Sequence, residues 1–229
     1  KPLVIMGLGA KLIAPKLIEH FRNLNIPYLL SLPMMAFSSQ DDPLCAMMMG
    51  HGGTYVGNTT ASFADWVFCI GISFNYFQVV SDDKCFLNAK YVFSLNPFPE
   101  LYITPMVTNY IISTAEKGLE LRIKQHPESP WLRQIREWKI KSNEISHTIF
   151  YKDSKFLQYG TVIENAQCLA DNFLREHPNS HVTICVDSGC NTVISAILFN
   201  FNDKKYRYRL FFSNKLAAVG AALGISMGC

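Results

Sequence analysis

The sequence lacks several features that would place it in a common class of protein. It contains no GxSxG nucleophile elbow, no HExxH zinc motif and no GxxxxGK[ST] phosphate loop, which argues against the hydrolases, metalloproteases and P-loop proteins that carry these motifs. It also has no apolar run long enough to span a bilayer and no charged-then-apolar leader after Lys1. We therefore expect no membrane span and no secretory signal.

An excess of charge of one sign is also missing. The 21 basic and 18 acidic residues are interspersed and give a net charge of +3, so no basic stripe is available to neutralise nucleic-acid phosphates. None of the seven cysteines forms a CxxC pair, which indicates a reduced, cytoplasmic protein. We interpret the cysteines as small buried side chains and assign neither a metal site nor a catalytic residue.

What the chain does have is an apolar core and a regular alternation of elements. With 49% hydrophobic residues in 229, it can form one large domain, or one domain and part of another. Apolar runs and helical periodicity alternate, which predicts an α/β fold with a Rossmann-like parallel sheet flanked by helices. The predicted strands are 2–6, 28–32, 65–70 and 91–95, and the predicted helices between them are 11–23 and 55–64.

The sequence changes character after residue 103. Helical patterns cover 107–125 and 131–144, although Gly118 could break the first of them. We place a boundary near residue 150, which gives a central domain at 1–150 and an incomplete second α/β unit at 151–229. That unit has a predicted helix at 161–176, a strand at 182–186 and an apolar helix at 217–229 that stops without a polar exit. We expect the chain to be a piece of a longer protein.

Glycines follow two of the predicted strands, at Gly7, Gly9 and Gly71, and Asn96 ends a third. Ligands of open parallel sheets bind outside the carboxyl ends of the strands, where these residues would lie together. The Gly7-Leu8-Gly9 turn permits either close approach of a ligand or a tight structural turn. The full GxGxxG spacing is absent because Leu12 stands at the third glycine position.

The densest feature is the segment Met47 to Tyr55, where Gly50, Gly52 and Gly53 precede a helix. Backbone N–H groups of such a loop can approach a ligand, and His51 could donate a hydrogen bond to it or simply be exposed. The methionines suit a core.

Polar residues also stand near other turns. Asp187 follows a strand and either caps the next helix or reaches a ligand together with Gly189 and Asn191. We interpret the adjacent carboxylates Asp41 and Asp42, and Asp82 and Asp83, as solvated turns.

Taken in order, these segments resemble the thiamine diphosphate-dependent enzyme family that includes acetolactate synthase. Residues 2–9 resemble its opening strand and glycine turn, 25–27 its "xIP" before the second strand, and 42–44 its "hPl" segment. The most specific stretch is 50–71, which resembles the family's glycine–histidine segment and "aDlvlxiG" strand without a gap. Further on, 131–141 resembles the linker helix, 182–191 the "DxGxx" start of the diphosphate-binding domain, and 217–228 its "pAAiGAalG" helix.

The resemblance implies cofactor-binding positions but also shows departures. Ser73 and Phe74 stand in the family's "GxRF", and Ser94 and Asn96 replace the acids of its "DIDP". Loss of the arginine removes a bidentate phosphate contact and loss of the acids removes ribose contacts, so FAD or ADP binding is disfavoured. The implied cofactor-binding residues are Gly7, Gly9, Gly50, His51, Gly53, Gly71, Ser73, Phe74, Asn96, Asp187, Gly189 and Asn191.

The resemblance further implies thiamine diphosphate and Mg²⁺ in the intact enzyme, a 2-oxo acid substrate and a homo-oligomer. The GDGxxN motif that holds the magnesium ion in the family is not in this sequence, so we expect the chain alone not to catalyse. One alternative is a non-catalytic relative that binds an adenine nucleotide or serves as a subunit-interaction domain. A weaker one, argued only from the GxG turn, is a nicotinamide-dependent oxidoreductase, although Ser31-Leu32-Pro33 has no acid at the end of the second strand.

Overall fold

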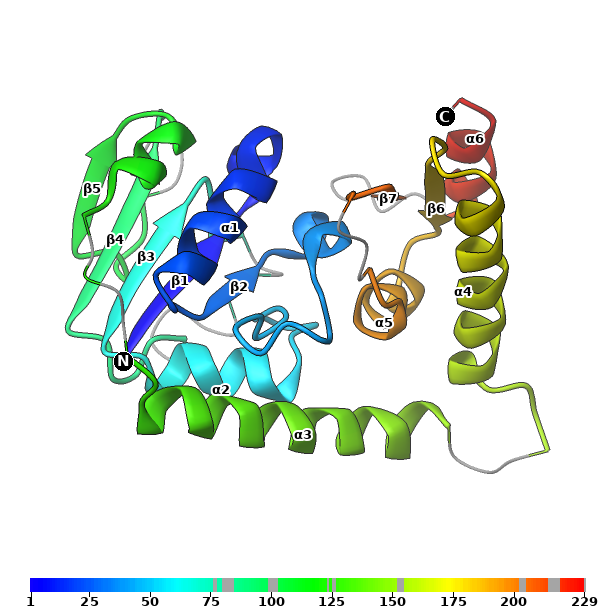
Figure 1. Cartoon of the computed structure of the whole chain (residues 1–229), viewed down its shortest axis with the longest axis horizontal. Coiled ribbons are helices and arrows are strands. Elements are labelled where there is room, and N and C mark those ends of the chain that lie inside the picture. The colour runs from blue at the N-terminus through cyan, green and yellow to red at the C-terminus, as the bar shows by residue number, and fades with distance from the viewer. Residues whose placement is uncertain are drawn as a thin grey trace.

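A computed structural model of the chain shows a large sheet domain and a smaller α/β unit, joined along one side by a long helix (Figure 1). The structure describes residues 1–75, 78–79, 85–98, 103–122, 124, 127–151, 155–201, 205–213 and 219–228. Asp82 and Asp83 lie outside these residues. No helix in the described ranges is both long and apolar enough to cross a bilayer.

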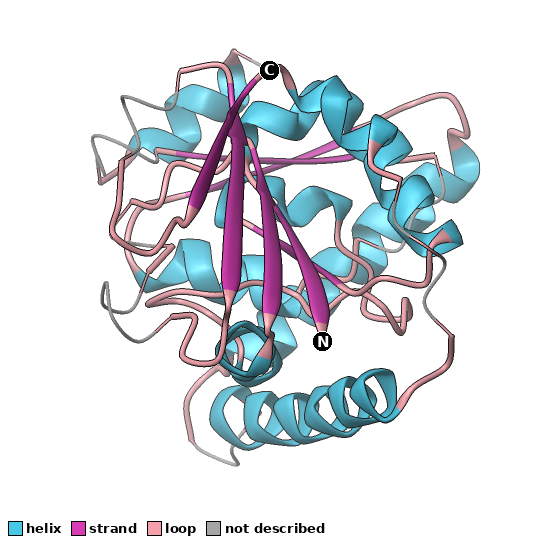
Figure 2. Cartoon of the chain, turned by 90° about the vertical axis from the view of Figure 1, so that its left-hand side faces the viewer, coloured by secondary structure: helices cyan, strands magenta, loops and turns pink. Residues whose placement is uncertain are grey.

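The sheet of the larger domain has five parallel strands in the order β2-β1-β3-β4-β5, seen side by side in Figure 2. Strands β1 and β3 are central and are formed by buried apolar runs, as expected for a sheet covered on both faces. From β1 the chain first adds β2 on one side of the sheet and then adds β3, β4 and β5 on the other side. The strand order therefore reverses between β1 and β3. The strands are β1 (Pro2–Met6), β2 (Tyr28–Leu30), β3 (Trp66–Ile70), β4 (Tyr91–Asn96) and β5 (Asn109–Ile112).

Helices cover the two faces of this sheet. Helix α1 (Ala14–Asn23) buries Leu17, Ile18 and Phe21 from its amphipathic face, and the 3-10 helix η1 (Leu8–Ile13) leads into it from β1. Thr54 accepts a hydrogen bond from the Gly57 N–H and so caps α2 (Tyr55–Phe63), which precedes β3. Two further 3-10 helices, η2 (Leu32–Phe37) and η4 (Ala115–Glu120), follow β2 and β5.

The long helix α3 (Pro130–Phe150) packs along α2 and extends toward the smaller unit (Figure 1). The Trp131 indole N–H donates to the carbonyl oxygen of Pro2 at 3.1 Å, and the Trp138 ring contacts that of Phe63 at a centroid distance of 5.3 Å. Lys139 is buried, and its ammonium group donates to the carbonyl oxygen of Asp42 at 2.6 Å. These contacts bind α3 to β1 and to the crossover between β2 and β3.

Asp42 is buried, so its interpretation as part of a solvated turn is wrong. Its Oδ2 atom accepts hydrogen bonds from Arg22 Nε and from the Tyr28 hydroxyl, both at 2.6 Å, and its Oδ1 atom accepts one from the Leu44 N–H at 2.9 Å. A buried carboxylate is tolerated here because cationic, hydroxyl and backbone donors surround it. Sequence spacing gave no sign of these donors.

The smaller unit is a βαβ crossover with one helix on each side. Strands β6 (Val182–Val186) and β7 (Tyr208–Phe212) are parallel and are joined through α5 (Cys190–Leu198). Helix α4 (Tyr159–Glu176) precedes this crossover and α6 (Ala221–Met227) follows it. Helix α5 and strand β7 both pack against η2 of the larger domain.

The parallel α/β architecture predicted from the sequence is confirmed, but several elements differ. The helix predicted at 107–125 is wrong, because Tyr110, Ile111 and Ile112 extend as β5 beside β4. The 3-10 helix η4 follows, in which the buried Gly118 lies so close to the side chains of Ile70 and Leu17 that a Cβ atom would be 2.9 Å from the nearer one. Helix α1 starts three residues later than predicted, α6 is shorter than 217–229, and α5 and β7 had no prediction.

Candidate functional site

The carboxyl ends of β1 and β3 are packed backbone against backbone at three glycines. Gly7 N–H donates to the Ile70 carbonyl at 2.8 Å, and Gly9 N–H donates to the Gly71 carbonyl at 3.0 Å. A Cβ atom on Gly7 would overlap the carbonyl oxygen of Gly71, and one on Gly71, which has φ +62°, would lie 2.6 Å from the carbonyl carbon of Gly9. Close packing alone therefore requires glycine at all three positions.

This packing changes what the glycine turn can offer a ligand. The N–H groups of Gly7 and Gly9 are used within the fold, and the first turn after β1 is the 3-10 helix η1 with α1 starting only at Ala14. The dipole of an α-helix thus does not begin at the glycine turn. Binding of a cofactor by Gly7, Gly9 and Gly71 stays a prediction.

Beyond β3 and β4, the residues at the family's flavin positions are held by internal hydrogen bonds. Ser73 donates to Gln78 Oε1 at 3.2 Å, and the Asn96 amide donates to the Ile72 carbonyl at 2.8 Å. Phe74 is buried and has a left-handed backbone, with φ +50°. The polar side chains of Ser73 and Asn96 are thus already used in hydrogen bonds within the protein.

Sequence reasoning missed Gln78, which is 6% exposed and accepts from both Ser73 and the Asn75 N–H. No pattern marks a single glutamine in a loop, so nothing in the sequence would have found it. Ser94 is 1% exposed and its hydroxyl has no hydrogen-bond partner among the described residues. The hydroxyl of Ser31, which follows β2, is also buried without a hydrogen-bond partner among the described residues. No acidic residue stands at the end of β2 to bind a ribose.

The glycine–histidine loop between β2 and α2 is closed by Asn58, a second residue that sequence reasoning missed. Its side chain accepts from the Gly50 N–H at 2.8 Å and donates to the Gly50 carbonyl at 3.2 Å. Gly50 has φ +108°, and a Cβ atom on Gly53 would lie 2.7 Å from Asn58 Oδ1. Gly50 and Gly53 thus shape the loop, whose exposed His51 is left at its tip.

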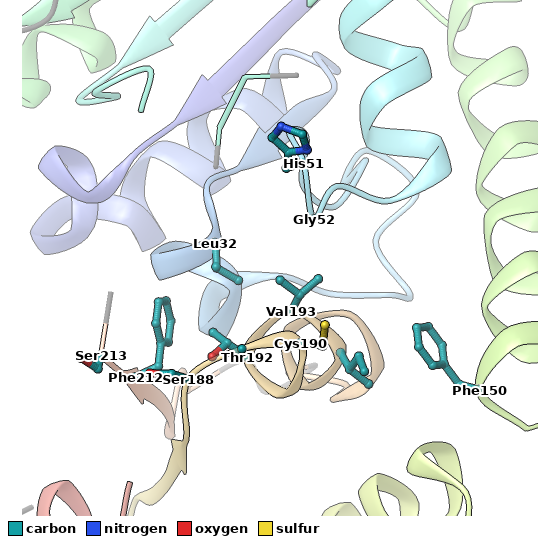
Figure 3. Close-up of a pocket in the computed structure, with 12 residues that line it drawn as sticks. Leu32, His51, Gly52, Phe150, Ser188, Cys190, Thr192, Val193, Phe212 and Ser213 are labelled. Atoms are coloured by element: carbon teal, nitrogen blue, oxygen red, sulfur yellow. The ribbon is translucent and has the colours of Figure 1, made fainter. Parts of the chain in front are cut away.

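His51 and Gly52 line an apolar cavity of about 600 Å³ between the sheet domain and the smaller unit (Figure 3). The opposite wall is the N-terminal turn of α5, where Val193 points toward Gly52. A Cβ atom on Gly52 would lie 2.7 Å from Val193 Cγ2, so this glycine permits the two parts to meet. The remaining lining residues are Leu32, Phe150, Ser188, Gly189, Cys190, Thr192, Ile194, Phe212 and Ser213.

Next to this cavity, Asp187 binds the start of α6. Its Oδ2 atom accepts from the Gly220 N–H at 2.7 Å and its Oδ1 atom from the Ser188 N–H at 2.9 Å. These backbone donors, Gly220 first, lower the pKa of Asp187 below its ordinary value. Asp187 therefore caps α6 and not the next helix, because parallel pairing of β6 with β7 brings the chain that follows β7 beside the end of β6.

The N-terminus of α5 has no side-chain cap. Its N-cap residue is Gly189, with φ +96° and open space where a Cβ atom would be. Asn191 accepts a hydrogen bond from the Tyr159 hydroxyl at 2.7 Å, which ties the first turn of α5 to α4. Orphan N–H groups of an uncapped helix are suited to bind an anion.

The residues predicted from the sequence therefore fall into two groups. Gly7, Gly9, Gly71, Ser73 and Asn96 lie at the carboxyl edge of the large sheet, whereas His51 and Gly189 line the cavity between the two parts. In the described part of the chain, no group of three or more His, Cys, Asp or Glu side chains is placed to hold a metal ion.

Comparison with known proteins agrees with the fold of the larger domain. No curated protein sequence matches the chain. Residues 1–100 match the family model described as "Thiamine pyrophosphate enzyme, central domain", and this range contains β1 to β4 with the glycine turns and the glycine–histidine loop. Residues 1–100 are therefore similar to the central domain of thiamine pyrophosphate enzymes, and their parallel sheet agrees with this similarity.

Proposed function

We propose that the chain is the central domain and the first part of the diphosphate-binding domain of an enzyme that decarboxylates or ligates 2-oxo acids, as acetolactate synthase does. Residues 1–150 would form the first part and 151–229 the second. The observation that carries the proposal is the uncapped N-terminus of α5, which opens on the cavity opposite the glycine–histidine loop.

The residues around this helix end suit the diphosphate of thiamine diphosphate. Gly189 leaves the approach free of a side chain, and the first N–H groups of α5 would donate to phosphate oxygens. Asp187 holds α6 beside the site through Gly220, so two helix N-termini are kept near one another. When bound, the cofactor's thiazolium carbon acts as an electron sink for the carbanion left by decarboxylation.

The apolar lining has a separate role in this proposal. Leu32, Phe150, Val193 and Phe212 would exclude water from the cavity, which strengthens hydrogen bonds to a charged ligand. His51 lines the opposite wall of the cavity and would donate to the ligand or to the substrate. A magnesium ion would need ligands beyond those that the described residues bring together.

Cofactor titration tests the proposal in the full-length protein encoded by the gene. Tryptophan fluorescence should show saturable binding of thiamine diphosphate with Mg²⁺, and G189A should weaken it roughly tenfold or more, because a side chain at φ +96° displaces the anion-binding turn. G224A is the control, since Gly224 lies within α6, has no atom within 4 Å of an added Cβ and does not line the cavity. Equal affinity in wild type and G189A would contradict this site.

The alternative, a non-catalytic relative that binds an adenine nucleotide or serves as a subunit-interaction domain, is favoured by the substitutions at the sheet edge. Ser73 and Asn96 bind Gln78 and the Ile72 carbonyl, where the resemblance places an arginine and an acid for the nucleotide. Titration with FAD, followed at the flavin absorbance band, and with ADP, followed by calorimetry, tests whether the sheet edge binds a nucleotide. Saturable FAD binding would overturn our expectation that flavin is not bound.

A further inference from the structure

A second cavity, of about 330 Å³, lies between the η1 and η2 helices of the sheet domain and strand β7 of the smaller unit. It shares no described lining residue with the cavity beside α5. Residues from both parts of the chain form its wall, so its shape depends on their packing. The described lining residues are Lys11, Pro33, Ala36, Phe37, His181, Tyr206, Tyr208, Arg209, Leu210 and Phe211.

Three basic side chains line this cavity, and each comes from a different segment. Lys11 is on η1, His181 directly precedes β6, and Arg209 is on β7. None of the described lining residues is acidic, and none of these three side chains forms an ion pair within the described residues. The two cations, Lys11 and Arg209, create a positive potential without a lining carboxylate to offset it, which favours an anionic ligand.

Aromatic rings form the other part of the wall. The rings of Phe37 and Tyr206 pack at a centroid distance of 5.7 Å, and the Lys11 ammonium group lies 5.5 Å from the centroid of the Phe211 ring. Tyr206 has a left-handed backbone, with φ +51°, which is costly for a residue with a side chain. The ring of Tyr206 is half-buried and lines the cavity beside Phe37.

We propose that this cavity binds an anion attached to a flat ring, of the size of a nucleoside monophosphate. Arg209 offers a planar fork of donors to a phosphate and Lys11 a point charge, while Phe37, Tyr206 and Phe211 offer faces on which a ring stacks. The volume is at the lower end of the range for small-molecule sites. The proposal does not depend on thiamine diphosphate binding at α5.

Isothermal calorimetry on the purified chain tests it with three probes: AMP, adenosine and inorganic phosphate. AMP should bind saturably. Adenosine and phosphate should each bind more weakly, because adenosine lacks the phosphate that Arg209 and Lys11 would bind and phosphate lacks the ring that the aromatic side chains would stack on. R209A and K11A should each weaken AMP binding roughly tenfold or more. The matched controls are R133A and K16A, which remove exposed basic side chains of α3 and α1 outside this cavity.

Three results would overturn the proposal. They are an absence of saturable AMP binding, AMP binding that R209A and K11A leave unchanged, and phosphate binding as tight as that of AMP. The second result would assign the nucleotide to another place, such as the carboxyl edge of the large sheet. Far-ultraviolet circular dichroism and the Tm of each variant check folding, which these exposed substitutions should preserve.

Discussion

The ammonium group of Lys139, in the middle of α3, lies 2.6 Å from the carbonyl oxygen of Asp42, in the segment that follows β2. The same nitrogen lies 3.4 Å from the carbonyl oxygen of Ser39. Burial lowers the pKa of Lys139, and the nearby carboxylate of Asp42 favours its charged form. One buried cation thus attaches the long helix to the larger domain.

Replacement of Lys139 by methionine tests this attachment. K139M removes the hydrogen bonds from this ammonium group to the carbonyl oxygens of Ser39 and Asp42, so we expect the free energy of unfolding to fall by about 1–3 kcal/mol. K141M is the matched control, because Lys141 is exposed and pairs with Glu144 on the same helix. Its effect should stay below about 1 kcal/mol. Urea unfolding measures both, and equal effects would contradict the anchoring role.

Tyr28 provides a prediction on pH. Burial, followed by the charges of Cys45 and Asp42, raises the pKa of its hydroxyl above the ordinary value of 10.0. The folded state therefore keeps a proton that the unfolded state loses above about pH 10. Stability from this group is fully present below pH 10 and is lost as the pH rises further.

Y28F should remove this pH dependence and also the hydrogen bond to Asp42. We expect it to lower the free energy of unfolding by about 1–2 kcal/mol at pH 7 and to lose less stability than wild type between pH 10 and 11. Comparing the two proteins at each pH cancels the contribution of Lys139. Parallel losses of stability in the two proteins would contradict the assignment.

The glycine turn yields a third prediction. G7A places a methyl group against the carbonyl of Gly71, so we expect a loss of about 3 kcal/mol or more or failure to fold. The control, G224A, adds a methyl group to α6 where nothing lies within 4 Å and should stabilise that helix by up to about 1 kcal/mol. Thermal unfolding followed by circular dichroism measures both. If G7A folds with the stability of wild type, the close packing of the Gly7 turn against Gly71 is not required and the prediction is contradicted.

The strands of the central sheet could be predicted from the sequence because their apolar runs are bounded by glycine or Asn-Pro, as at Gly7, Gly71 and Asn96. The sequence pattern predicts a helix across Asn109 to Ile112, and this prediction is wrong because the pairing with β4 that makes the run a strand is a contact between separate segments. Strand β7 is recognisable only beside β6 for the same reason.

The candidate site was predicted in outline. The glycines and His51 mark their loops locally, whereas Asn58 and Gln78 act through contacts that no spacing shows. The sequence indicates a capping role for Asp187 at the next helix, but the N–H group that it binds belongs to Gly220, 33 residues later, and is brought near only by the fold.

Asp187 can be tested through the helix that it caps. D187A should accelerate hydrogen exchange of the Gly220 N–H, which donates to the Asp187 carboxylate at 2.7 Å. Because its pKa is lowered, protection in wild type should persist at the ordinary aspartate pKa of about 4 and be lost only as the pH falls further. D171A, on α4, is the control. Unchanged exchange at Gly220 in D187A would contradict the cap.

The central claim is that this domain supports thiamine diphosphate chemistry on 2-oxo acids, and carbon dioxide release measures it most directly. The full-length protein encoded by the gene would be freed of cofactor and incubated with pyruvate and Mg²⁺, with or without thiamine diphosphate. We predict carbon dioxide release that depends on thiamine diphosphate and falls in G189A but not in G224A. Cofactor-independent release, or none with pyruvate and with longer and branched 2-oxo acids, would contradict it.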